Sequence, residues 1–194
     1  ASQPESPDVQ ITSPKTFDHV KGLIQFTGSA AGSGFSYYRL QVGQGLYPQQ
    51  WIQIGEDVTH PEKSGSLGTW DTNGLEGLYV VQLLVVRNDQ RVERDILQVT
   101  IDNTKPQVQI LTPSDGERIT YQQGEPVMMQ VTASDNLVLK RVEYLVDGEL
   151  KMTLMQPPFI ILWSMKLGEH DLSVRAYDLA GNLSEADISF LVEK

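Results

Sequence analysis

Three side chains whose oxygen atoms are suited to bind a metal ion lie where two apolar, strand-like stretches of the sequence end. Asp135 and Asn136 follow the stretch Val127–Ala133, and Asp178 follows Gly168–Tyr177. Carboxylate and amide oxygens are the ligands that Ca²⁺ prefers, so a Ca²⁺ site forms here if the two strand ends meet at one pole of a sandwich. Asp and Asn also shape turns unaided, by accepting backbone N–H bonds. The sequence leaves both interpretations open.

A second group of residues is aromatic. Tyr37, Tyr47 and Trp51 lie in and beside the stretch Gly43–Pro61. Aromatic faces stack on sugar rings or anchor a protein partner, and these three residues are therefore candidate ligand-binding residues. A buried Trp also commonly fills the core of a β-sandwich. Exposure of the three side chains would favour binding, whereas burial of all three would favour a structural role.

The sequence does not offer a catalytic set. Ser134-Asp135-Asn136 matches the Ser-x-Asn of penicillin-reactive transpeptidases, but Ser-x-x-Lys and Lys-Thr-Gly, which that chemistry also needs, are missing. His19, His60 and His170 are isolated in sequence, and we expect them in solvent near turns rather than in a triad or a metal site. We therefore predict no catalytic residue in this chain.

Composition excludes several further classes of site and partner. The 194 residues contain no cysteine, which excludes disulfides, thiolate metal sites and a Cys nucleophile. The formal net charge of -10 argues against a nucleic-acid partner, which needs a basic surface. No apolar run approaches the roughly 18 residues of a membrane span, so we expect no direct membrane insertion. The Pro- and Ser-rich start at Ala1–Pro7 is typical of a linker, and we expect a piece of a longer protein.

The elements that must position these residues form an internal repeat. Pro7–Pro14 is matched by Pro106–Pro113, and Trp70 is matched by Trp163, with both tryptophans expected in cores. A period of roughly 95 residues suits tandem sandwich domains and is too long for a solenoid. We predict an all-β fold of two tandem immunoglobulin-like β-sandwiches. The predicted parts are a linker or tail over 1–7, a sandwich over 8–103 with an insertion around 43–61, and a second sandwich over 104–194.

Short apolar runs bounded by Gly, Pro, Asn and Asp predict thirteen strands, six in the first sandwich and seven in the second. They are expected near Val9–Thr12, Leu23–Gly28, Tyr37–Val42, Trp51–Ile54, Leu78–Arg87, Ile96–Ile101, Val108–Leu111, Val127–Ala133, Lys140–Val146, Leu150–Leu154, Phe159–Trp163, Gly168–Tyr177 and Ala186–Val192.

Residues 106–194 resemble the bacterial immunoglobulin-like domains that are repeated in secreted and cell-surface proteins. The resemblance rests on five segments, namely Leu111–Gly116, Val131–Asn136, Val142–Gly148, Pro157–Phe159 and Ala176–Ser184. It implies a β-sandwich and an extracytoplasmic location, in the cell envelope or at the cell surface. It is specific for the fold and does not indicate a function.

Two segments in the first half of the chain point to a narrower family. Ser36–Gln41 followed by Trp51–Gly55, ahead of a bacterial immunoglobulin-like module, is similar to the C-terminal extensions of some class A penicillin-binding proteins, the peptidoglycan glycosyltransferase–transpeptidases. This resemblance implies a non-catalytic accessory module, for binding or spacing, of a cell-wall enzyme whose chemistry lies upstream. Its partner would be cell-wall glycan or another cell-envelope protein, and its cofactor none, apart from the Ca²⁺ discussed above. The alternative is a stalk or adhesive module of a bacterial surface protein.

Overall fold

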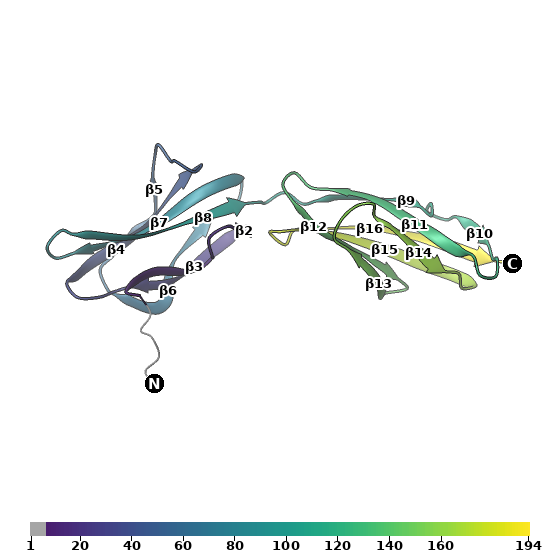
Figure 1. The fold of residues 1–194 in the computed structure, drawn as a ribbon, viewed down its shortest axis with the longest axis horizontal. Coiled ribbons are helices and arrows are strands. Elements are labelled where there is room, and N and C mark those ends of the chain that lie inside the picture. Colours follow the sequence, from purple (N-terminus) through teal and green to yellow (C-terminus); the bar gives the residue numbers. More distant parts are fainter. Residues whose placement is uncertain (1–6) are drawn as a thin grey trace, which may run out of the picture. The chain divides into compact units, whose positions relative to one another are not determined.

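The computed structural model describes residues 7–194, and all regular structure in this part of the chain is β (Figure 1). The chain divides into two compact units, called here module one, up to Asn103, and module two, Thr104–Lys194. Most of the predicted tail over 1–7 lies outside the described residues. Between residues 7 and 194, no helix is long and apolar enough to cross a membrane.

Module one is a sandwich of a three-stranded and a five-stranded sheet, with strand orders β1-β3-β6 and β2-β8-β7-β4-β5. All neighbouring strands are antiparallel except β2 and β8, which pair in parallel. The strands are β1 (Val9–Ser13), β2 (Asp18–Val20), β3 (Leu23–Ala30), β4 (Phe35–Gln44), β5 (Ile52–Val58), β6 (Glu62–Asp71), β7 (Gly77–Arg87) and β8 (Val92–Ile101).

Module two has the same architecture, with strand orders β14-β11-β9 and β10-β16-β15-β12-β13. Its parallel pair is β10 with β16, which corresponds to β2 with β8. The strands are β9 (Gln107–Thr112), β10 (Arg118–Thr120), β11 (Pro126–Ser134), β12 (Leu139–Val146), β13 (Glu149–Leu154), β14 (Ile160–Ser164), β15 (Gly168–Asp178) and β16 (Leu183–Glu193).

Alternation along β4 and β12 builds the two cores. Tyr38, Leu40 and Val42 face inward in module one and are at most 3% exposed, as a half-buried antiparallel strand requires. In module two Val142, Tyr144 and Val146 hold the corresponding positions on β12 and are almost fully buried. Trp70 and Trp163 are both buried in these cores, as predicted from the sequence.

Each core contains a tyrosine whose hydroxyl donates to a backbone carbonyl. Tyr38 donates to Leu67 across 3.2 Å, and Tyr144 donates to Phe159 across 2.6 Å. These bonds satisfy polar groups that burial would otherwise leave without a partner. Burial raises the pKa of Tyr144 to about 12, so its phenol stays protonated at neutral pH.

The structure contains three strands that the sequence analysis missed. The largest is β6, Glu62–Asp71, which pairs with β3 along most of its length. Only Leu67 and Trp70 are buried in it, so its apolar residues do not alternate and the local pattern is weak. The other two, β2 and β10, are three residues long and are defined by parallel pairing with a distant strand.

Candidate ligand-binding site

The clearest surface feature of module one is the connection between β4 and β5, residues 45–51, which lies within the predicted insertion. Gly45 donates its N–H to the carbonyl of Leu78 on β7 across 2.8 Å, which fixes the start of this loop. Pro48 lies against Gly43, where an added Cβ would overlap the proline ring. The absence of a side chain at Gly43 therefore lets the loop pack onto β4.

This loop and the adjoining strands enclose a groove of about 340 Å³, called here the loop groove. Tyr47 at its edge is 86% exposed, and the buried Tyr79 of β7 lines it as well. The edge of Tyr79 meets Trp70 with ring centroids 5.3 Å apart, so Tyr79 is anchored in the core. The residues lining the groove are Val42, Gly43, Gln44, Tyr47, Gln49, Gln50, Ile52 and Tyr79.

The lining of the loop groove is aromatic, aliphatic and amide in character. It contains no Asp, Glu, Lys, Arg or His, although the whole chain carries a formal net charge of -10. A groove whose only ionisable groups are two tyrosines is suited to binding by stacking and hydrogen bonding rather than to general acid–base or nucleophilic chemistry.

The three predicted aromatic residues do not form one cluster. Tyr47 lines the groove, and Trp51, which is 37% exposed, stands at the end of the same loop without lining the groove. Tyr37 lies near the opposite end of β4, seven residues before Gln44, which corresponds to roughly 23 Å of strand. It contacts the guanidinium of Arg39, with 5.2 Å between that group and the ring centroid. The structure thus separates Tyr37 from the other two residues.

The sequence analysis did not identify the amide residues of the groove. Gln44, Gln49 and Gln50 line it and are exposed. Five of the thirteen residues from Gln41 to Gln53 are glutamine, and this local excess is the signal that could have identified them. Tyr79 had no such signal, because it comes to the groove from β7, about 30 residues later in the chain.

In module two the predicted acidic residues converge at the end of the sandwich where β11 and β15 end. The loop after β11 meets the turn after β15, since Leu179 donates its N–H to the carbonyl of Val138 across 3.3 Å. Carboxylate oxygens of Asp135 and Asp178 lie within 4.8 Å of each other. Asn136 is exposed beside them.

The two carboxylates differ in how they are satisfied. Asp178 is fully buried and accepts the backbone N–H of Asn182 at 2.7 Å and its side-chain amide at 2.6 Å. Oδ2 of Asp135 accepts the N–H of Leu137 at 2.9 Å, while Oδ1 is buried and has no hydrogen-bond partner among the described residues. Turn formation therefore accounts for Asp178 and leaves one oxygen of Asp135 without an explanation, so the Ca²⁺ site stays a prediction.

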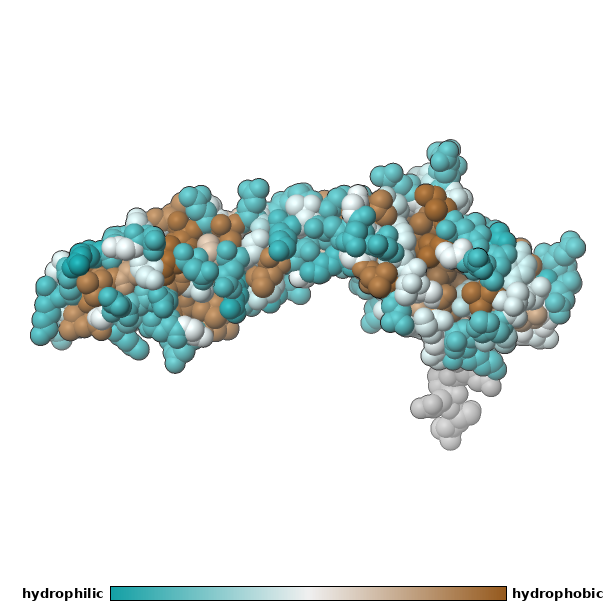
Figure 2. Space-filling view, turned by 180° about the vertical axis from the view of Figure 1, so that it is seen from behind, coloured by the Kyte–Doolittle hydropathy of each residue, from teal (hydrophilic) through white to brown (hydrophobic). Residues whose placement is uncertain are grey.

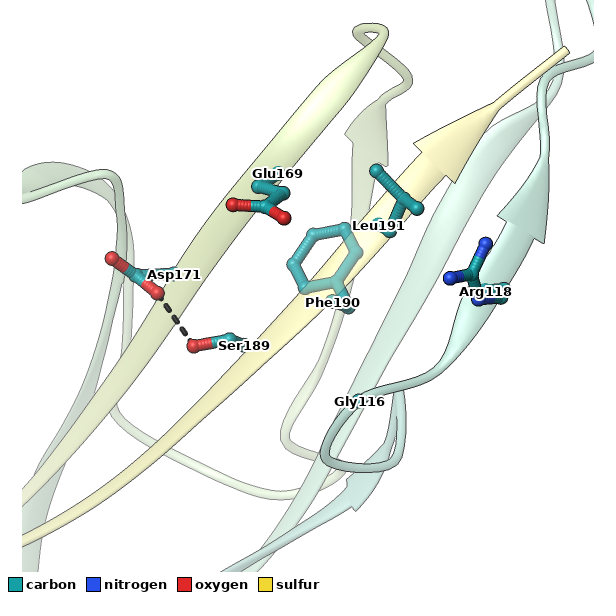
Figure 3. Close-up of a pocket in the computed structure, with 7 residues that line it drawn as sticks. All are labelled: Gly116, Arg118, Glu169, Asp171, Ser189, Phe190 and Leu191. Atoms are coloured by element: carbon teal, nitrogen blue, oxygen red, sulfur yellow. Dashed lines mark hydrogen bonds between the residues drawn. The ribbon is translucent and has the colours of Figure 1, made fainter.

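A groove of module two has a volume of about 520 Å³ and lies along β15, β16 and β10 (Figure 3). Three of its polar groups already have partners: Ser189 donates its hydroxyl to Asp171 at 2.7 Å, and Arg118 pairs with Glu193 at 2.9 Å. No histidine or lysine lines this groove, so Ser189 does not belong to a Ser-His or Ser-Lys pair there. The lining residues are Gly116, Arg118, Glu169, Asp171, Ser189, Phe190 and Leu191.

The histidines differ in environment. His60 is exposed and His19 is partly buried, but His170 is only 8% exposed, so the expectation of a solvated His170 was wrong. Its Nδ1 lies 2.8 Å from Oδ2 of Asp147, and its Nε2 lies 2.9 Å from the carbonyl of Lys166. Its ring also packs against Trp163, with centroids 4.7 Å apart. His170 is thus part of the structure of module two.

Apolar side chains also reach the surface in separate areas, brown in Figure 2. On module two, Met128 on β11 and Leu162 on β14 are directly paired and are 47% and 68% exposed. No polar group of defined geometry accompanies this pair, so it does not define a ligand chemistry.

Comparisons with known proteins identify the fold. A family model described as a bacterial Ig domain matches residues 106–174, which lie in module two. The fibronectin(III)-like modules of Clostridium thermocellum CbhA are similar over 95% of this chain and 93% of theirs, with a TM-score of 0.57 and 20% sequence identity. The predicted fold, two tandem immunoglobulin-like sandwiches, is thereby confirmed.

Two further solved structures have lower scores. Murine CEACAM1b is 12% identical, with a TM-score of 0.48, over 94% of this chain and 97% of its own. A tetra-tandem repeat from the extending region of a large adhesion protein is 13% identical, with a TM-score of 0.39, over 94% of this chain and 48% of its own. A comparison with curated protein sequences gives no significant match. The immunoglobulin-like fold fits a non-catalytic accessory or surface module, and domains of this bacterial family are often extracellular.

Proposed function

We propose that this chain is a non-catalytic binding module of an extracytoplasmic cell-wall enzyme, and that the loop groove holds the enzyme on its substrate or on an envelope partner. The observation that carries the proposal is Tyr47, an aromatic side chain 86% exposed at the edge of a groove. Exposure of so large an apolar ring is unfavourable in water, and such rings are common anchors at binding surfaces.

The construction of the loop also supports binding. A spacer needs only a closed sandwich, and module two connects the equivalent strands through the turn Asp147-Gly148. Module one uses residues 45–51 instead, packs them on Gly43 and fixes them to Leu78. A longer, ordered loop that presents a groove is typical of binding surfaces carried on a rigid scaffold.

The proposed parent is a class A penicillin-binding protein, for which the support is the sequence resemblance of Ser36–Gln41 and Trp51–Gly55. An antibody against this chain, applied to source cells labelled with a fluorescent penicillin, tests this parentage. We expect one full-length band to carry both signals. A band that stays unlabelled while other penicillin-binding bands are labelled would contradict it, and would favour the stalk or adhesive module.

Binding is tested separately by sedimentation of the purified chain with isolated cell-wall material. We expect the wild-type chain to sediment and the Tyr47→Ala variant to bind about tenfold more weakly, because it loses the exposed ring. Tyr121→Ala is the matched control, since Tyr121 is also partly exposed but lies on module two. Equal sedimentation of Tyr47→Ala and wild type would contradict a role for the groove.

A further inference from the structure

The side chains that line the loop groove restrict what it can bind. Gln44, Gln49 and Gln50 each present a primary amide, which donates through Nε2 and accepts through Oε1. Gln49 donates to the carbonyl of Tyr47 at 3.3 Å, whereas Gln44 and Gln50 make no side-chain hydrogen bond within residues 7–194. Two exposed amides are thus free to bind a ligand.

The absence of charge in this lining argues against an ionic ligand. A charged ligand that leaves water needs an opposite charge or several charge-assisted hydrogen bonds to offset its desolvation, and the eight lining residues contain no ionisable acid or base apart from two tyrosines. Uncharged ligands that form hydrogen bonds do not have this requirement. The groove therefore favours a neutral ligand.

An aromatic ring beside primary amides suits one type of neutral ligand in particular. The apolar face of a pyranose stacks on an exposed ring such as that of Tyr47. A secondary acetamide presents an N–H donor and a C=O acceptor on opposite edges, so one primary amide of the groove can accept from its N–H while another donates to its C=O. We infer that the loop groove binds an uncharged, N-acetylated amino sugar within a glycan chain, with Tyr47 under the ring and Gln44 and Gln50 on the acetamide.

The volume of the groove agrees with this ligand class. At about 340 Å³ it lies near the lower limit of small-molecule sites, so it accommodates a short segment of a chain rather than a large ligand. The groove of module two does not compete for this role, because its Arg118 and Asp171 already form polar pairs within the protein. The inference rests on the proposed function, since it names the ligand of the same groove.

The test compares three soluble oligosaccharides of equal length: a tetramer of N-acetylglucosamine, a tetramer of glucose and a tetramer of glucosamine. Calorimetric titration of the full chain at about 150 mM salt suppresses non-specific attraction of the cationic tetramer to the acidic protein. We expect the N-acetylated tetramer to bind about tenfold more tightly than the glucose tetramer, and glucosamine not to bind measurably.

Variants separate stacking from recognition of the acetamide. Tyr47→Ala should weaken binding of both neutral tetramers, because stacking does not depend on the substituent. The double variant Gln44→Leu, Gln50→Leu should retain stacking and lose the preference for the N-acetylated tetramer. Tyr121→Ala should behave as the wild type, and unchanged melting curves verify that each variant is folded.

The outcomes distinguish the inference from the proposed function. Equal affinity for the N-acetylated and glucose tetramers would overturn recognition of the acetamide and leave a glycan-binding module. Absence of binding to all tetramers, together with Tyr47-dependent sedimentation on cell-wall material, would overturn the sugar ligand and leave a module that binds an envelope protein. Absence of both kinds of binding would overturn the proposed function itself.

Discussion

Strands β7 and β15 occupy the same place in modules one and two, and the differences between the modules are concentrated at the two ends of these strands. Both strands have eleven residues and lie between equivalent neighbours. The third residue is Tyr79 in module one and His170 in module two. Their last residues are Arg87 and Asp178. The sandwich is conserved between the modules, while the chemistry at its two ends is not.

Tyr79 and His170 lie near one end of β7 and β15. There, the length of the connection between β4 and β5, or between β12 and β13, decides whether a groove exists. In module two, the turn Asp147-Gly148 places Asp147 against His170, and the ring of His170 packs on Trp163 and Phe190. In module one, the seven-residue loop replaces this turn, and Tyr79 lines an open groove. The groove therefore arises here from the longer loop.

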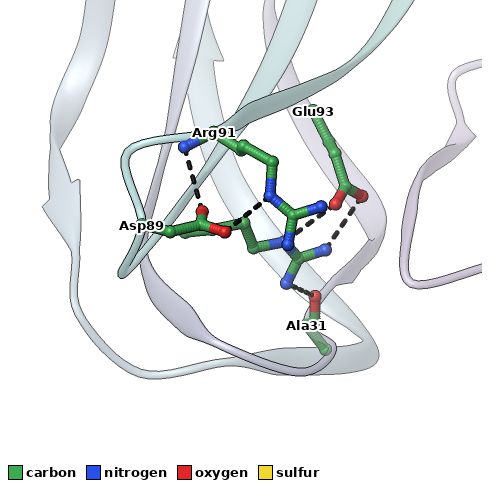
Figure 4. Close-up of polar contacts among 5 residues, drawn as sticks. Ala31, Asp89, Arg91 and Glu93 are labelled. Atoms are coloured by element: carbon green, nitrogen blue, oxygen red, sulfur yellow. Dashed lines mark hydrogen bonds and ion pairs between the residues drawn. The ribbon is translucent and has the colours of Figure 1, made fainter.

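At the other end, two different devices secure the hairpin that follows the strand. Arg87 is 5% exposed and binds Glu93 through Nε at 3.0 Å and Nη2 at 2.9 Å, and it also donates to the carbonyl of Ala31 (Figure 4). Asp178 instead accepts two bonds from Asn182, four residues later. Module one thus uses a buried cation that joins two loops, and module two uses a local carboxylate turn.

The largest expected effect comes from removal of Arg87. Arg87→Ala leaves the carbonyl of Ala31 and the carboxylate of Glu93 without their donors, and we expect it to destabilise module one by about 3 kcal/mol. Native-state hydrogen exchange on the full chain reports the two modules separately. In Arg87→Ala, hydrogen-exchange protection should fall in module one. The control is Arg91→Ala in the same hairpin, which should change the stability of module one little because Arg91 is exposed. An unchanged module one would show that Arg87 is not needed for the hairpin.

The matching change in module two is Asp178→Ala. It removes the acceptors for the backbone N–H and side-chain amide of Asn182, both buried, and should cost about 2 kcal/mol in module two. The effect is smaller than that of Arg87→Ala because the lost bonds are local and join a single turn. Asp187→Ala, an exposed change on β16, is the control and should leave the protection of the turn unaltered. If Asp178→Ala destabilised module two no more than Asp187→Ala does, the turn would form without Asp178.

The sequence predicted the sandwiches because alternation is a local property. The buried faces of β4, β12 and β15 follow directly from period-two patterns such as Leu172, Val174 and Ala176. Strand β6 escaped prediction because Glu62–Asp71 contains Gly, Ser and Lys, and its strand conformation depends on pairing with β3, more than 30 residues earlier.

The candidate site was predictable only in part, for a related reason. Tyr47 was identified because an aromatic residue in a Gly- and Pro-containing loop stands out in sequence. Tyr37 was grouped with it because the two are near in sequence, whereas an extended strand separates them in space. The burial of His170 depends on Trp163 and Phe190 from other strands, which a local pattern does not encode.

Low pH should destabilise the turn Asp147-Gly148, which in module two stands in the place of the loop 45–51. Burial alone would raise the pKa of Asp147, but hydrogen bonds from His170 and from the backbone of Asp171, with the nearby charges, hold that pKa below its usual range. The unfolded chain therefore takes up this proton first as pH falls. The stabilisation is complete above about pH 4, the unfolded pKa, and is lost as pH falls through the lower folded pKa.

Asp147→Asn tests this linkage. Because the Asp147 side chain is 49% exposed, we expect the variant to lose only about 1 kcal/mol in module two at about pH 6. The difference from wild type should shrink toward about pH 2, well below the unfolded pKa, because the carboxylate takes up a proton as pH falls through its lowered folded pKa. Urea unfolding followed by hydrogen exchange in module two measures it. A difference that is the same at both pH values would rule out ionisation of Asp147 as its cause.

An effect of similar size is expected from the acidic residues of module two where β11 and β15 end. We propose that Ca²⁺ binds Asp135 with Asn136 and Asp178, because Oδ1 of Asp135 is buried without a partner among the described residues. At a concentration about five times its dissociation constant, Ca²⁺ would raise the free energy of unfolding of module two by about 1 kcal/mol. This corresponds to a rise of roughly 4 to 8 °C in melting temperature for a domain of this size.

The comparison between modules supplies the internal control for this prediction. Module one has Arg87 where module two has Asp178, so millimolar Ca²⁺ should raise the unfolding temperature of module two alone. Asp135→Asn, which removes the charge but keeps an oxygen acceptor for Leu137, should abolish the rise. Mg²⁺ should be less effective, because its smaller, octahedral shell tolerates an irregular loop site poorly. Melting curves of module two that coincide with and without Ca²⁺ would mean that these three side chains only shape the turns.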